Sequence, residues 1–251
     1  MQWTDDGIVL ARQRHGEHAA VVSLLTREHG RHAGLVRGAM GRRLRGVIEP
    51  GNEVSAEWRA RLTEHLGHYR IELKTAHAAA TFGAPLRLLA LVSAAALTER
   101  TLAEHEPHPA LFAAFQALLR ALDESAEWPA VYARFELGLL AELGYGLDLE
   151  TCAVSGATAG LAYVSPRTGR AVTRDRAGGY EERLLPLPAF LADGRGGAAA
   201  NEPLIDIRNG LRLTGHFLEQ RVFAPHARKM PSARERLIEG LARADTISGI
   251  G

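Results

Sequence analysis

The sequence contains four His-x-x-His pairs, and this spacing could place two imidazoles on one metal ion. Imidazole is a common zinc ligand, but residues three apart share a face only on a helix. Three of the pairs fall where strands or turns are expected, and the fourth flanks Pro107 ahead of a helix. Solvated turn histidines are therefore favoured, and a metal-dependent enzyme built on these pairs is the runner-up. The pairs are His15/His18, His29/His32, His65/His68 and His105/His108.

A basic segment at residues 27–45 offers a second kind of chemistry, the neutralisation of phosphate. It holds six arginines against one acid, Glu28, although the whole chain carries a formal net charge of only +1. Arginines between two strands of a small barrel can meet backbone phosphates without reading bases. The only aromatic residues of the first 75 that could stack on bases are Trp3, Trp58 and Tyr69, so we expect electrostatic, salt-dependent binding that ignores sequence. The arginines predicted to contact DNA in this segment are Arg27, Arg31, Arg37, Arg42, Arg43 and Arg45.

Cys152 begins a Cys-x-x-Ser-Gly loop that has the outline of a zinc knuckle, with Ser155 in place of the second thiolate. A structural zinc site needs four donors, and Cys152 is the only cysteine of the chain. No neighbouring cation activates this thiol, since Glu150 is the nearest charge. Phosphate-binding Gly-Lys-Ser/Thr and hydrolase Gly-x-Ser-x-Gly motifs are missing. We therefore expect no bound metal, no cofactor, no internal disulfide and no enzymatic activity.

The elements that must position these residues change character along the chain. The first 75 residues consist of short β-rich runs separated by charged or glycine-containing segments, as in hairpins. Five short strands in about seventy residues predict a small closed barrel, and the OB-fold is the common five-stranded solution. The predicted strands are Gly7–Arg12, Ala20–Thr26, His32–Gly38, Val47–Trp58 and His65–Leu73.

From Pro85 onward the apolar spacing becomes helical, and proline stands near the start of several segments, where its missing N–H costs nothing. Residues 150–185 are rich in glycine and predict a hairpin and loop. The predicted fold class is therefore α+β, with an N-terminal five-stranded OB-fold barrel at residues 1–78. A helical domain at residues 79–251 follows and includes the degenerate zinc-finger-like loop. The predicted helices are Pro85–Leu97, Pro109–Leu122, Pro129–Leu143, Pro203–Phe223 and Pro231–Ala244.

One predicted helix places an arginine beside an apolar stripe. Phe135 and Leu139 share one face, and Arg134 borders it. The arginine could lay its stem on that surface and pair with Glu136. It could instead clamp the carboxylate of a bound peptide beside an apolar groove. Composition alone favours the first interpretation.

The sequence shows no signal for a membrane or for export. The opening residues, MQWTDDGIVL, carry acids where a signal peptide needs positive charge. The most apolar stretch, 86–97, is interrupted by Arg87 and is too short to span a bilayer. We expect a cytoplasmic protein with no membrane partner.

Together these segments resemble the bacterial recombination mediators of the RecO family over nearly the whole chain. Residues Gly7–Ala39 resemble the family's barrel. The run RFELGLLAELGYG, from Arg134 to Gly146, with Cys152 after it, resembles the family's signature helix and metal loop. Residues Leu218–Leu237 are similar to its terminal helices.

The resemblance implies a non-enzymatic protein of DNA repair and recombination, associated with the nucleoid. Such proteins bind single- and double-stranded DNA, anneal complementary strands and engage the C-terminal tail of single-stranded DNA-binding protein. With RecR they help to load RecA. The resemblance moves Arg134, Phe135 and Leu139 to the partner-tail site and adds Arg234 to the DNA contacts. A scaffold that binds protein tails but not DNA is a third alternative.

Overall fold

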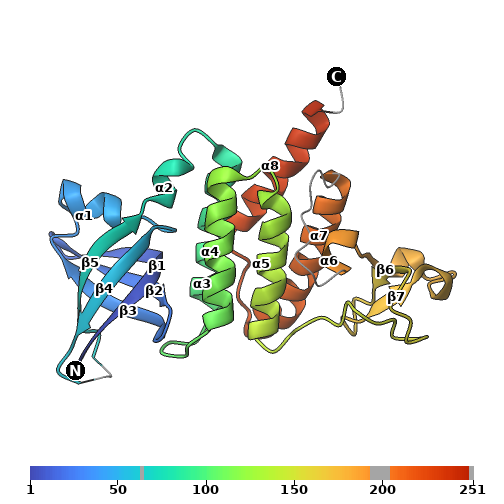
Figure 1. Ribbon diagram of the computed structural model, residues 1–251, viewed down its shortest axis with the longest axis horizontal. Coiled ribbons are helices and arrows are strands. Elements are labelled where there is room, and N and C mark those ends of the chain that lie inside the picture. The colour runs from blue at the N-terminus through green and yellow to red at the C-terminus, as the bar shows by residue number, and fades with distance from the viewer. Residues whose placement is uncertain (63–64, 193–203, 249–251) are drawn as a thin grey trace. The chain divides into compact units, whose positions relative to one another are not determined.

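The computed structural model describes residues 1–62, 65–192 and 204–248 (Figure 1). The chain divides into two compact units, Met1–Glu124 and Ser125–Gly251. Among the described residues, no helix is both long and apolar enough to cross a membrane. The domain boundary predicted at residue 78 differs from this division, and it stays a prediction.

Five strands of the first unit close into a barrel in the order β1-β2-β3-β5-β4. Neighbouring strands pair antiparallel except β3 and β5, which pair in parallel through the single register Leu35↔His68. Strand β1 reaches two partners because its first half pairs with β4 and its second half with β2. The strands are β1 (Gln2–His15), β2 (Ala19–Thr26), β3 (Gly30–Arg37), β4 (Glu53–Arg59) and β5 (His68–Thr75).

The interior of the barrel is filled by side chains from alternating positions of the strands. Val9, Val22, Leu24, Val54 and Ile71 are all buried there. A ligand of this barrel must therefore bind on its outer surface or at one of its ends.

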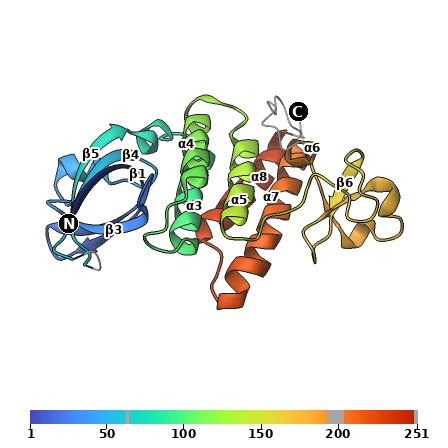
Figure 2. The same cartoon turned by 60° about the horizontal axis from the view of Figure 1, so that its bottom comes forward.

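Four helices complete the first unit. Helix α1 follows β3 directly, and Leu44 and Val47 from it pack against the barrel core. Helix α3 packs on β1 and β2 and lies beside α4 (Figure 2). The helices are α1 (Arg42–Val47), α2 (His77–Ala80), α3 (Pro85–Thr101) and α4 (Pro109–Glu124).

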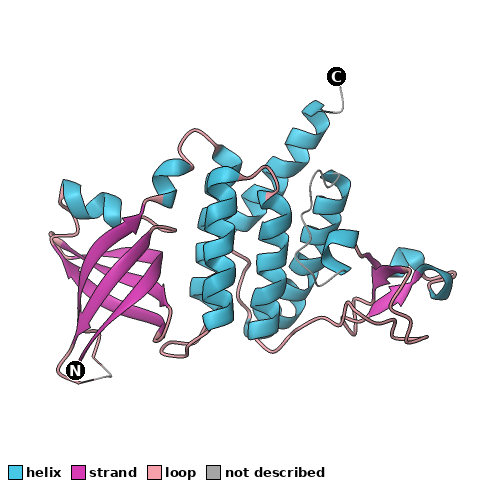
Figure 3. Ribbon diagram, in the orientation of Figure 1, coloured by secondary structure: helices cyan, strands magenta, loops and turns pink. Residues whose placement is uncertain are grey.

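The second unit is built on helix α5, which packs against α7, and α7 in turn packs against α8. A three-stranded sheet in the order β7-β6-β8 follows α5 in the chain (Figure 3). A π-helical turn at Leu218–Phe223 extends α7. The elements are α5 (Trp128–Glu142), β6 (Leu161–Val164), β7 (Ala171–Thr173), β8 (Leu185–Pro186), α6 (Ala189–Ala192), α7 (Leu204–Phe217) and α8 (Ser232–Ser248).

The α+β class, the five-stranded N-terminal sheet and the helical C-terminal part are confirmed. The predicted strand Val47–Trp58 is wrong in its first half, because Arg42–Val47 form helix α1 and β4 begins only at Glu53. Gly51, with a φ of +90°, turns the chain between these two elements. The basic segment therefore ends on a helix rather than on an open loop.

Candidate nucleic-acid interface

A groove of about 800 Å³ opens between β3, β5 and α1, and its lining reaches the core residues Val36, Tyr69 and Ile71. It exists because β3 and β5 pair at one register only, so the two strands diverge beyond Leu35 and His68. Apolar side chains form its floor, and arginines from three different elements stand at its edge. The lining residues are Leu35, Val36, Arg37, Arg43, Leu44, Val47, His68, Tyr69, Arg70, Ile71, Glu72 and Leu73.

The groove carries an excess of positive charge. Arg37, Arg43 and Arg70 are exposed cations, and Glu72 is the one acid that lines it. Glu72 lies 3.5 Å from the Arg70 guanidinium in an exposed ion pair, which is worth little in water. The Arg37 guanidinium also approaches the His68 ring at 3.5 Å. This surface can take an anion, and its apolar floor suits the sugar or base beside a phosphate.

Helix α1 holds its arginines on a fixed platform. The buried side chain of Asn52 donates hydrogen bonds to the carbonyls of Gly46 at 2.8 Å and Val47 at 3.2 Å, which satisfies the end of this short helix. Arg12 donates to the Arg45 carbonyl at 2.9 Å. The side chains of residues 42, 43 and 45 stay exposed. The structure thus brings Arg37, Arg42, Arg43 and Arg45 together, as predicted for phosphate contacts, although their role stays a prediction.

Arg70 belongs to the same surface, and the sequence analysis missed it. The alternation of strand β5 could have found it, since Tyr69 and Ile71 point inward and Arg70 between them must point outward.

The two other arginines of the basic segment lie elsewhere. The prediction that Arg31 contacts DNA is corrected, because only 16% of its side chain is exposed and other residues of the protein bind its guanidinium. It contacts Glu99 at 3.3 Å and Glu104 at 3.1 Å and donates to the Leu102 carbonyl at 3.0 Å. Arg27 is exposed in the β2–β3 turn, 4.9 Å above the Phe112 ring and at the opposite end of β3 from Arg37.

The prediction that Arg234 contacts DNA is also corrected, because its side chain is buried. Its Nε and Nη2 donate to the two oxygens of Glu136 at 2.6 and 2.9 Å, and Glu136 is fully buried. Nη2 also donates to the Leu211 carbonyl at 2.8 Å. Burial by itself lowers the pKa of Arg234, but the Glu136 carboxylate outweighs it and raises that pKa overall. Arg234 therefore joins α5, α7 and α8 as a structural residue.

The apolar residues predicted for a partner tail are core residues. Phe135 is 2% exposed and Leu139 is fully buried, so neither lines a groove. Arg134 is half-buried, with its guanidinium 5.6 Å from the Phe190 ring and its Nε donating to the Phe190 carbonyl at 3.3 Å. The assignment of Phe135 and Leu139 is corrected, and that of Arg134 stays a prediction.

A different surface of the second unit has the character expected of a tail site. A groove of about 490 Å³ between α7 and α8 combines arginines with exposed or half-buried aliphatic side chains. Arg208 and Arg212 stand one turn apart on α7, with Ile205 preceding them. Its lining residues are Ile205, Arg208, Asn209, Leu211, Arg212, Gly215, Arg234, Ile238, Leu241 and Ala242.

The histidine pairs form no metal centre in the part of the chain that the structure describes, where no group of three or more His, Cys, Asp or Glu side chains could hold an ion. His15 and His18 are exposed in and after the end of β1. His29 and His32 both contact tryptophan rings, and the one carboxylate of the described residues in contact with this pair, that of Asp5, lies 3.0 Å from His29 Nδ1.

Cys152 occupies the interior of the loop that precedes β6. It is 2% exposed, and its Sγ accepts from the Thr173 N–H at 3.4 Å and lies 3.5 Å from the Thr173 hydroxyl. Burial raises the pKa of this thiol, but hydrogen bonds from Ser155 and Thr173 outweigh it and lower the pKa to about 6. One of these donors, Ser155, stands where a zinc knuckle would have its second thiolate.

Comparison with known proteins identifies the class of this protein. Residues 1–76 match the family described as Recombination protein O N terminal, and residues 83–230 match Recombination protein O C terminal. The chain is 52% identical over 252 residues to the DNA repair protein RecO of Rhodospirillum centenum. This alignment covers 100% of this chain and 98% of that protein. It is 49% identical over 246 residues to that of Methylobacterium nodulans, with 98% and 99% covered.

The fold and these comparisons define a protein of DNA repair and recombination. More closely, the chain belongs to the RecO family.

Proposed function

We propose that this protein is a non-enzymatic recombination mediator that binds single- and double-stranded DNA on its barrel and anneals complementary strands. The observation that supports the proposal is the basic groove between β3, β5 and α1, with one lining acid against three lining arginines. An annealer has to screen the repulsion between two phosphate backbones, and clustered guanidinium groups do this without base contacts. In this proposal the barrel is an OB-fold, and the protein acts in the cytoplasm at the nucleoid.

The test replaces Arg37, Arg43 and Arg70 with glutamine and measures the salt dependence of binding to a fluorescent oligonucleotide. Each lost phosphate contact lowers the slope of log K against log salt by about 0.7 for single strands and about 0.9 for duplex. We expect the slope to fall by about 2 and about 3, respectively, and annealing of complementary strands to slow.

The matched control replaces three other exposed arginines, Arg120, Arg167 and Arg183, which lie outside the groove. It removes the same total charge, so a specific site predicts a much smaller change in slope. Equal slopes for the two triple variants would exclude the groove as the phosphate site. No binding or annealing by the unaltered protein at low salt would favour the scaffold that binds only protein tails.

The second element of the proposal is docking on the acidic C-terminal tail of single-stranded DNA-binding protein, by which this chain would cooperate with RecR in loading RecA. The α7/α8 groove supports it, because such a tail needs cations beside an apolar surface. Arg208 and Arg212 supply the cations, and Ile205 and Ile238 supply the apolar side chains. Docking there would raise the local concentration of the barrel at protein-coated DNA.

Two variants distinguish the candidate tail sites. Binding of a labelled synthetic tail peptide should fall at least tenfold in Arg208→Ala/Arg212→Ala, since charge-assisted hydrogen bonds contribute about 1.5–3 kcal/mol each. The Arg134→Ala variant should bind the peptide nearly as well as the unaltered protein, and both should bind bare DNA normally. A larger loss in Arg134→Ala would return the tail site to Arg134.

A further inference from the structure

A second cavity of about 630 Å³ opens at the end of the barrel where the chain begins. It is distinct from the basic groove, with no lining residue in common. Rings dominate its wall, and we call it the aromatic pocket. Its lining residues are Met1, Gln2, Trp3, His29, His32, Trp58 and His105.

The rings of the aromatic pocket pack on one another in stacked and edge-on contacts. The Trp3 ring lies 4.1 Å from the His29 ring at an interplanar angle of 9°, and 5.6 Å from the Trp58 ring at 20°. The His32 ring stands edge-on to both tryptophans, at 5.0 and 4.8 Å. The exposed His105 ring lies 4.5 Å from that of His32. A flat ring that enters would therefore meet a wall made mostly of rings.

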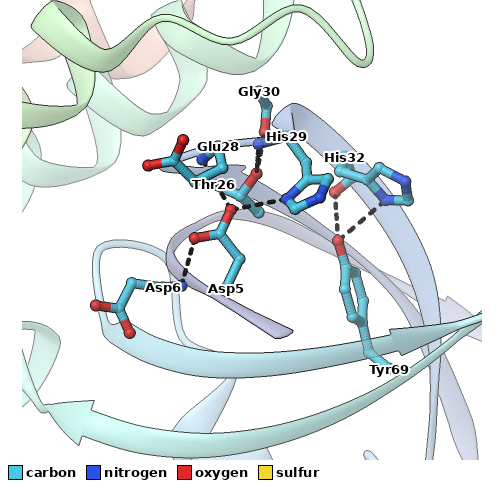
Figure 4. Close-up of polar contacts among 8 residues, drawn as sticks. All are labelled: Asp5, Asp6, Thr26, Glu28, His29, Gly30, His32 and Tyr69. Atoms are coloured by element: carbon cyan, nitrogen blue, oxygen red, sulfur yellow. Dashed lines mark hydrogen bonds and ion pairs between the residues drawn. The ribbon is translucent and has the colours of Figure 1, made fainter. Parts of the chain in front are cut away.

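Hydrogen bonds fix the orientation of these rings (Figure 4). The buried Asp5 carboxylate contacts His29 Nδ1 at 3.0 Å and accepts from the Glu28 N–H at 2.8 Å. The Tyr69 hydroxyl lies 3.1 Å from His32 Nδ1. Trp58 Nε1 donates to the Leu66 carbonyl at 3.1 Å. The pocket is therefore shaped before any ligand arrives, which reduces the entropy lost on binding.

Two features of the backbone bring the last ring into place. The N–H of His105 donates to the Arg31 carbonyl at 2.9 Å, which ties the α3–α4 connection to β3. His105 itself has a φ of +64°, a left-handed conformation that is uncommon outside glycine. Arg31, excluded above as a phosphate contact, thus has a positioning role here through Glu99 and Glu104.

One ring of the aromatic pocket, that of His32, is uncharged at neutral pH. Burial, followed by the neighbouring His105, lowers the pKa of His32 to about 4. Within the described part of the chain these histidines belong to no group that could hold a metal ion. A preformed cavity lined mostly by aromatic rings suits a flat heteroaromatic ring better than it suits an isolated anion or a cation.

We propose that the aromatic pocket takes an unpaired base of single-stranded DNA. The inference rests on the proposed DNA-binding function and deepens it. Every base has a π-face, so stacking on aromatic side chains is tolerant of sequence. Cations for the adjacent phosphates stand nearby in the chain. Arg61 is exposed after the end of β4, the Met1 ammonium is held at the Ala60 carbonyl, and Arg59 is exposed but paired with Glu57. A base inside a duplex cannot enter, so the pocket gives preference for single strands.

The experiment compares two single-stranded probes of equal length and charge, oligothymidylate and an abasic oligonucleotide, on the unaltered protein. Stacking of one base should make the abasic strand bind roughly five- to 150-fold more weakly. In Trp3→Ala and in His105→Ala this difference should shrink, while duplex binding stays unchanged. Trp3→Phe, which keeps an aromatic ring, should retain most of the difference.

Each outcome bears on one proposal. Equal binding of the two probes by the unaltered protein overturns the aromatic pocket as a base site and leaves the basic groove intact. A difference that persists in His105→Ala and Trp3→Ala, both folded by circular dichroism, also overturns it. Failure to bind either strand or duplex refutes the proposed DNA-binding function itself. The glutamine variant of Arg37, Arg43 and Arg70 should weaken both probes equally.

Discussion

Replacing Arg234 with methionine should destabilise this protein severely without removing a DNA contact. Methionine fills a similar volume of apolar stem but lacks the guanidinium. The change would delete two hydrogen bonds to Glu136, at 2.6 and 2.9 Å, and one to the Leu211 carbonyl, at 2.8 Å. Of the contacts that the described residues make with Glu136, the hydrogen bond from the Thr214 hydroxyl, at 2.5 Å, would remain, and Glu136 would stay fully buried.

The magnitude follows from the asymmetry between making and breaking a buried ion pair. Charge-assisted hydrogen bonds contribute about 1.5–3 kcal/mol each, but three bonds of one side chain are not additive. Removal of one partner from a buried pair costs about 3–5 kcal/mol, because the other charge stays desolvated. We expect a loss of about 3–5 kcal/mol in the free energy of unfolding, which is a large share of the 5–15 kcal/mol typical of proteins.

Urea unfolding followed by far-ultraviolet circular dichroism measures this loss. A second variant, Glu136→Met combined with Arg234→Met, removes both charges and leaves apolar side chains in their place. Replacement of a whole buried pair by apolar groups is often neutral or stabilising. The double variant should therefore recover most of the stability that Arg234→Met loses.

The reasoning fails if Arg234→Met unfolds within about 1 kcal/mol of the unaltered protein, well below the cost of an unpaired buried carboxylate. It fails also if the double variant is less stable than the single one. A selective loss of DNA affinity in a fully stable Arg234→Met protein would restore Arg234 as a phosphate contact.

Three further outcomes are expected. The pKa of His32 is about 4 in the folded protein against 6.5 in the unfolded chain, so its contribution to stability is complete above pH 6.5 and is lost as the pH falls toward 4. Unfolding in urea should therefore show a free energy about 2.5 kcal/mol lower at pH 4.5 than at pH 7.5. The His32→Phe variant should not show this loss. Gly67→Ala should cost more than Gly16→Ala, since both glycines have positive φ but only at Gly67 would a Cβ meet Trp58, 2.4 Å from its Nε1; thermal melts compare them. Atomic absorption of purified protein should find no stoichiometric zinc, because Cys152 is the only thiol.

Local patterns predicted the five strands of the barrel, apart from the start of β4, and most helices of the protein. The apolar run of β2, the alternation in β3 and the prolines in the first turns of α4 and α5 are signals carried by neighbouring residues. Helix α1 was missed because the run RRLRGV has too few apolar positions to show a helical period, and it is held mainly by Asn52 and by packing of Leu44.

The residues that each arginine contacts in the folded protein could not be predicted in the same way. The ion pairs Arg31–Glu99 and Arg234–Glu136 join residues that are 68 and 98 positions apart in the sequence. No short stretch of sequence therefore contains both partners. The stripe through Phe135 presents the same pattern whether it faces a groove or a core. The aromatic pocket, likewise, draws its five rings from four separate segments of the chain, and the sequence around Trp3 gives no indication that His105 lies beside it.

The two proposed DNA sites can be separated by salt. Binding by the three arginines of the basic groove releases counterions, so its contribution should weaken with a slope of about −2 for single strands. Base stacking in the aromatic pocket releases none, and salt screens it little. As salt rises, affinities for oligothymidylate and for the abasic strand should therefore fall in parallel, with a constant ratio between them. If the ratio instead shrinks toward one, the preference for the intact strand has an electrostatic origin, and Trp3 and His105 do not hold a base.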